Sequence, residues 1–77
     1  MFKTGTMIKV THKAHVYSHM GFSDPNTIIP ETVEIMRVAR VIRSKKHGLI
    51  VWFKRPDGTG YGINDVENNP QFDFLKA

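Results

Sequence analysis

The residues best suited to binding chemistry are basic side chains gathered in the middle of the chain. Between positions 37 and 55 there are seven of them and no acidic residue: Arg37, Arg40, Arg43, Lys45, Lys46, Lys54 and Arg55. All seven acidic residues of the chain lie elsewhere, although its net charge is +4. Such a cluster can neutralise the phosphates of DNA or RNA, or bind an acidic protein surface.

Three aromatic side chains are candidates for stacking against bases. Trp52 lies inside the basic stretch, Tyr61 follows it closely, and Tyr17 lies nearer the N-terminus. Bases can stack on such rings where the rings are exposed. Rings beside the arginines would favour nucleic acid, whereas rings beside Phe22 and Ile28 would favour a groove for a protein.

Histidines 12, 15 and 19 have the spacing His-x-x-His-x-x-x-His. On a helix they would share one face and could ligate a metal ion through imidazole nitrogens. The surrounding residues alternate between apolar and polar, which is typical of a strand and directs His12 and His15 to opposite faces. We therefore expect solvated histidines, with no metal and no cofactor.

The sequence carries no recognisable catalytic motif. It has no cysteine, no Gly-x-Ser-x-Gly, no His-Glu-x-x-His and no glycine-rich phosphate loop. Asp57 and Asp65 flank turns, where bonding to the local backbone explains an aspartate. The sequence thus predicts a binding module rather than an enzyme.

Hydrophobic alternation and turn signals predict a mainly β chain of five strands, near 6–17, 33–43, 48–55, 58–63 and 71–75. Turns at 44–48 and 56–58 would join the three central strands, because both contain glycine among polar residues. Residues 18–32 combine glycine and proline with apolar residues that show no period, and we expect a long loop there.

Within the strand at 48–55, Leu49, Val51 and Phe53 should lie on one face, with Ile50 and Trp52 on the other. The segment 33–43 fits two interpretations, a strand or a helix, because its apolar residues also follow the spacing of a helix core face: Ile35, Val38, Ala39 and Ile42. A helix near 31–46 would give an α+β fold of β-α-β-β order. We favour the strand because β-branched residues are frequent. Arg37 and Arg40 then fall among apolar residues on opposite faces, which requires either a bulge near the middle or an arginine at the margin of the sheet.

The segments ARVI, KKHGLIVWF and DGTGYGINDVEN, spread over roughly residues 36–68, resemble the core of SH3-like small β-barrels of the Tudor and KOW kind. The resemblance implies a five-stranded barrel, with residues 18–32 as the long loop after the first strand. It also implies one turn of 3₁₀ helix at Asn64–Glu67. It implies a fold and does not imply a ligand.

Length and composition limit the chain to one domain, residues 1–77. No apolar run approaches the ~20 residues that a membrane span requires, and no signal peptide is recognisable, so we expect a cytoplasmic protein. The leading hypothesis is a small module that binds DNA or RNA through its basic hairpin. The alternative is a protein-interaction module, inhibitor or adaptor that acts on a larger enzyme, similar in size and style to phage accessory proteins.

Overall fold

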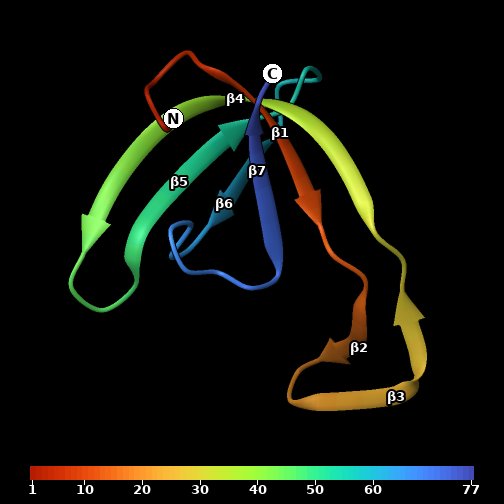
Figure 1. The fold of residues 1–77 in the computed structure, drawn as a ribbon. Coiled ribbons are helices and arrows are strands. Elements are labelled where there is room, and N and C mark those ends of the chain that lie inside the picture. Colours follow the sequence, from red (N-terminus) through yellow and green to blue (C-terminus); the bar gives the residue numbers. More distant parts are fainter.

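A computed structural model describes residues 1–77 as seven strands in two antiparallel sheets (Figure 1). The strands are β1 (Met7–His12), β2 (His15–His19), β3 (Phe22–Ile29), β4 (Thr32–Ser44), β5 (Gly48–Lys54), β6 (Gly60–Ile63) and β7 (Phe72–Lys76). The mainly β fold predicted from the sequence is confirmed. No helix in the structure is long and apolar enough to cross a membrane.

The main sheet has five strands in the order β6-β5-β4-β1-β7. β4 is the longest strand, with 13 residues, and arches across the molecule so that it pairs with both β1 and β5 (Figure 1). β6 and β7 have one neighbour each, and no backbone pairing between them closes the sheet into a continuous barrel.

β4 settles the choice between strand and helix, and the predicted alternative of a helix near 31–46 is wrong. Met36 and Val38 are buried on the face that carries the core, which is the alternation of a strand. The expected bulge is present: the register with β5 shifts between Val38 and Arg40. The extra residue moves Arg40 away from the apolar face and leaves Arg37 and Arg40 both exposed.

The core lies on the inner face of the main sheet. It consists of eight buried apolar side chains: Ile8, Val10, Met36, Val38, Val51, Phe53, Ile63 and Val66. Phe2 approaches it from the N-terminal segment, with its ring edge-on to Phe53 and Phe74. The predicted faces of β5 are confirmed, because Val51 and Phe53 are buried while Trp52 is exposed.

Residues 13–29 differ from prediction in two ways. The expected strand at 6–17 is divided, since β1 ends at His12 and β2 starts a separate sheet at His15. The expected loop at 18–32 is mostly a hairpin, in which β2 and β3 join through Met20 and Gly21, both with positive φ. Two such residues form the tight turn that suits the twist of a hairpin. The hairpin extends away from the main sheet, and its strands pair only with each other (Figure 1).

The segment after β6 also departs from prediction. No 3₁₀ helix forms at Asn64–Glu67, because Asp65 has a φ of 51°, in the left-handed region. A turn forms instead, in which the Asn68 N–H donates to the Asp65 carbonyl. The Val66 N–H donates to the carbonyl of Leu49, which fixes the buried Val66 side chain against β5.

Candidate nucleic-acid interface

Three exposed basic residues and the tryptophan lie on one face of the sheet formed by β4, β5 and β6. Directly opposed residues of antiparallel strands point to the same face of a sheet. The register places Arg37 opposite Lys54 and Arg40 opposite Trp52. We use the name outer face for these four residues with their neighbours Gly60 and Gly62, which oppose Lys54 and Trp52 from β6.

The indole of Trp52 lies on the backbone of β6. A Cβ atom added to Gly62 would be 2.8 Å from Cζ3 of Trp52 and 2.9 Å from both Cε3 and Cη2. Because three consecutive ring atoms are almost equidistant from that point, the point lies over the face of the ring and not at its edge. One face of the indole therefore covers Gly62, and the side chain keeps 46% of its surface exposed.

A small basic cleft lies at Lys54, which is two residues beyond Trp52 on β5. It has a volume of about 270 Å³ and is lined by Met7, Arg37, Lys54, Arg55, Pro56 and Gly58. Arg37 and Lys54 carry like charges directly opposite each other, an arrangement that destabilises a sheet unless an anion lies between them. Neither forms a salt bridge with a carboxylate, and the same is true of Arg40.

Lys45 and Lys46 lie in the turn between β4 and β5, at the far end of the same hairpin. The Ser44 hydroxyl oxygen accepts hydrogen bonds from the backbone N–H groups of Lys46 and His47, each at 3.2 Å, and so organises this turn. Both lysine side chains are exposed and neither has a carboxylate partner. The turn thus extends the positive charge of the outer face.

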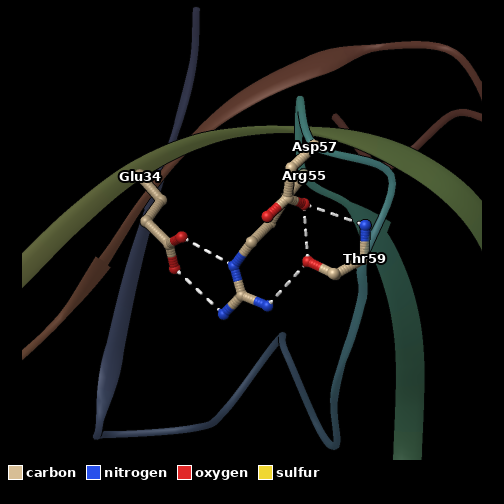
Figure 2. Close-up of polar contacts among 4 residues, drawn as sticks. All are labelled: Glu34, Arg55, Asp57 and Thr59. Atoms are coloured by element: carbon tan, nitrogen blue, oxygen red, sulfur yellow. Dashed lines mark hydrogen bonds and ion pairs between the residues drawn. The ribbon is translucent and has the colours of Figure 1, made fainter.

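Two of the seven predicted basic residues are paired within the chain. Arg43 donates to Glu67 at 3.2 Å, with both side chains largely exposed. Arg55 forms a two-pronged pair with Glu34: Nε donates to Oε1 at 2.7 Å and Nη2 to Oε2 at 3.4 Å (Figure 2). The remaining five, Arg37, Arg40, Lys45, Lys46 and Lys54, are free to meet an external anion.

The guanidinium of Arg55 is held by a wider network (Figure 2). Its Nη1 donates to the Thr59 hydroxyl, which donates to Asp57, and its guanidinium lies 4.8 Å from the centre of the Tyr61 ring. The hydrogen bond to Glu34 raises the pKa of Arg55. The backbone N–H and the hydroxyl of Thr59 both donate to Asp57 and lower the pKa of that carboxyl.

Tyr61 and Tyr17 do not join Trp52. Tyr61 lines a second cavity, of about 450 Å³, together with Val10, His12, Thr32, Glu34, Met36, Arg55 and Phe72. Tyr17 lies on the β2–β3 hairpin, opposite Asp24. Of the three predicted stacking residues, only Trp52 is brought beside free arginine and lysine side chains.

The histidines are arranged differently from the prediction that His12 and His15 point to opposite faces. Their rings stack 4.3 Å apart, and His12 also stacks on Phe72 at 4.3 Å, because the chain leaves the main sheet after His12. Burial lowers the pKa of His12, and the neighbouring His15 lowers it further. No three histidine, aspartate or glutamate side chains gather in a way that could hold a metal ion.

Sequence reasoning missed three features of this region: Gly62 beneath the indole, Met7 in the basic cleft, and the carboxylates that pair Arg43 and Arg55. The Asp57-Gly58 turn could have revealed the first, since it fixes the register that puts Gly62 opposite Trp52. Met7 comes from a strand 30 residues away in sequence from its partner Arg37, and no local pattern indicates that contact.

Comparisons of the chain with protein-family models, with curated proteins and with solved structures find no significant match. The geometry and charge of the outer face are therefore the grounds on which a function can be proposed.

Proposed function

We propose that this protein is a nucleic-acid-binding module that contacts the phosphates of DNA or RNA through its outer face and the adjoining β4–β5 turn. One observation carries the proposal: five basic side chains without an internal partner lie on the β4–β5 hairpin, and three of them, Arg37, Arg40 and Lys54, share a face with the exposed Trp52. Unpaired arginines and lysines repel one another, and a polyanion relieves that repulsion while it releases its counterions.

The order of the strands supports placing this module among the SH3-like folds. β1 lies between the last strand and the long β4, and β5 and β6 follow as a meander. The β2–β3 hairpin follows β1 in the chain, where the resemblance to such folds predicts a long loop. Fold alone does not define the ligand, so the functional proposal depends on the outer face.

Salt-dependent binding tests the proposal. Fluorescence anisotropy would be measured with labelled single-stranded DNA, duplex DNA and RNA at about 50 and 200 mM salt. If all five basic side chains contact phosphates, the logarithm of the association constant should fall with the logarithm of salt concentration with a slope of about −4. Absence of binding to all three probes at the lower salt concentration would overturn the proposal.

A charge-reversed variant locates the contact. Replacing Lys45 and Lys46 by glutamate should weaken binding by more than about tenfold at 50 mM salt and reduce the slope by about two. The matched control is Lys3→Glu with Lys76→Glu, which changes the net charge equally at exposed positions outside the basic hairpin. Equal weakening in both variants would mean that net charge alone attracts the probe.

Protein binding is the second candidate, and the β2–β3 hairpin favours it. Met20, Phe22 and Ile28 are 91%, 65% and 57% exposed there, and no strand of the main sheet covers them. Exposed apolar residues gathered on one element are typical of protein interaction sites. Replacing two of them, by Phe22→Ser and Ile28→Ser, should leave nucleic-acid binding unchanged, because they are separate from the outer face.

A further inference from the structure

We propose that the outer face selects single-stranded nucleic acid, with one unpaired base stacked on Trp52 and the adjoining phosphate in the cleft between Arg37 and Lys54. This inference rests on the proposed function and specifies its ligand. It gives Trp52 the role of stacking on a base, and Arg37 and Lys54 the role of binding a phosphate.

The base site follows from the position of the indole. Gly62 occupies one face of the ring, so the ring lies along the sheet surface with its other face turned away from the backbone. Trp52 keeps 46% of its surface exposed. A second flat ring can stack on that free face, and Arg40, directly opposite, can contact the edge of the stacked base or its phosphate.

The phosphate site follows from the spacing along β5. Lys54 is two residues beyond Trp52 on the same face, a distance of about 6.8 Å along a strand. That distance lies within the reach of one nucleotide from its base to a neighbouring phosphate. Arg37 and Lys54 line the cleft of about 270 Å³, and both lack an internal carboxylate partner.

Duplex nucleic acid cannot occupy both sites. A paired base inside a duplex is covered on both faces by its neighbours in the stack, so away from the duplex ends it presents no free face to Trp52. A duplex could reach only the basic side chains, through its phosphates. The arrangement of a stacking ring beside a phosphate cleft is therefore useful only for an unpaired strand.

Trp52 is the only tryptophan of the chain, so its emission reports on the base site directly. The protein would be titrated with oligothymidylate of about twelve nucleotides and with a duplex of the same length. Stacking should quench Trp52 emission on the single strand, which should bind at least about tenfold more tightly than the duplex. The duplex should bind without quenching.

Two substitutions separate the base site from the phosphate site. Trp52→Leu should weaken single-strand binding about 5- to 100-fold while leaving the salt slope unchanged, and Trp52→Phe should restore part of the loss. Lys54→Gln should reduce the salt slope by about one for both probes. Trp52 is exposed, so these variants should fold, which circular dichroism would verify.

Gly62 and Gly60 of β6 provide a matched test of whether the position of the Trp52 ring matters for binding. Gly62→Ala places a methyl group against the ring face and should displace the indole, with weaker quenching and weaker single-strand binding. Gly60→Ala is the control, because the nearest atom to its Cβ lies 4.0 Å away. Single-strand binding reduced equally by both substitutions would overturn the assigned base site.

The outcomes distinguish the two proposals. If single strand and duplex bind equally tightly and neither quenches Trp52, the single-strand inference fails while nucleic-acid binding stands. If neither probe binds at about 50 mM salt, both proposals fail.

Discussion

His12 is the residue whose surroundings most directly predict a pH effect. Its ring is stacked between His15 and Phe72, and burial lowers its pKa from the ordinary value of 6.5. The unfolded chain therefore binds a proton at a higher pH than the folded chain does. By linkage, the free energy of unfolding should decrease as the pH falls below 6.5 towards the folded-state pKa, and this effect should be absent above 6.5.

Urea unfolding at a series of pH values between about 7.5 and 5 checks this expectation. His12→Phe keeps a flat ring in the stack but cannot be protonated, so its stability should vary less over this range. His19→Phe, on the exposed hairpin, is the control. An equally steep decline in the His12→Phe variant would contradict the assignment.

At the residue scale, the sequence identified the basic side chains and Trp52 but could not tell which charges are free. Arg55 and Arg43 are neutralised by Glu34 and Glu67, which lie 21 and 24 positions away in sequence. Pairing over such separations depends on how the strands are arranged in the sheet. The stacking of His12 on His15 was missed for a related reason, since a strand pattern does not show where the strand ends.

Gly48, the first residue of β5, is constrained both by its backbone conformation and by the nearby Asp65. It has a φ of 66°, and a Cβ there would lie 2.5 Å from Oδ1 of Asp65. Gly58 also has positive φ, at 92°, but nothing lies within 4 Å of its Cβ position. Gly58→Ala should therefore cost about 1–2 kcal/mol for the backbone alone. Gly48→Ala should cost more, because the Asp65 contact adds to that strain.

Urea denaturation of the two alanine variants measures the difference. Similar losses would mean that the segment after β6 moves away easily from the β4–β5 turn.

At the element scale, the strands that carry the core could be predicted from the sequence. The β2–β3 hairpin, which lies outside the core, could not. β5 followed the expected alternation because a strand with one buried face must alternate. The hairpin of β2 and β3 was missed because its turn uses Met20 and Gly21 in place of the usual Asn-Gly, and because Pro25 lies within β3. A proline is compatible with an edge strand, and β3 pairs with β2 alone.

For the molecule as a whole, stability should depend on the buried side chains of the main sheet and hardly at all on exposed apolar side chains such as Ile35. Met36 is fully buried, whereas its neighbour Ile35 on the same strand is 51% exposed. Met36→Ala should cost about 2–5 kcal/mol, because it leaves a cavity among the other core side chains. Ile35→Ala should stay within about 0.5 kcal/mol of the parent.

Thermal unfolding followed by circular dichroism gives both values. A domain of this size buries a small core, so Met36→Ala could leave most molecules unfolded at 37 °C. Comparable destabilisation by Ile35→Ala would indicate that Ile35 is covered, as in an assembly of several copies.

The β2–β3 hairpin has a consequence for how this molecule can change. Its strands pair only with each other and contribute no side chain to the core cluster. A segment of that kind opens, lengthens or accepts new residues at little cost to the rest of the structure. Substitution in the main sheet is limited by packing, and at the outer face by charge. The hairpin is subject to neither limit, so it is the part of the chain where a new specificity could be added while the sheet and its charged surface are kept.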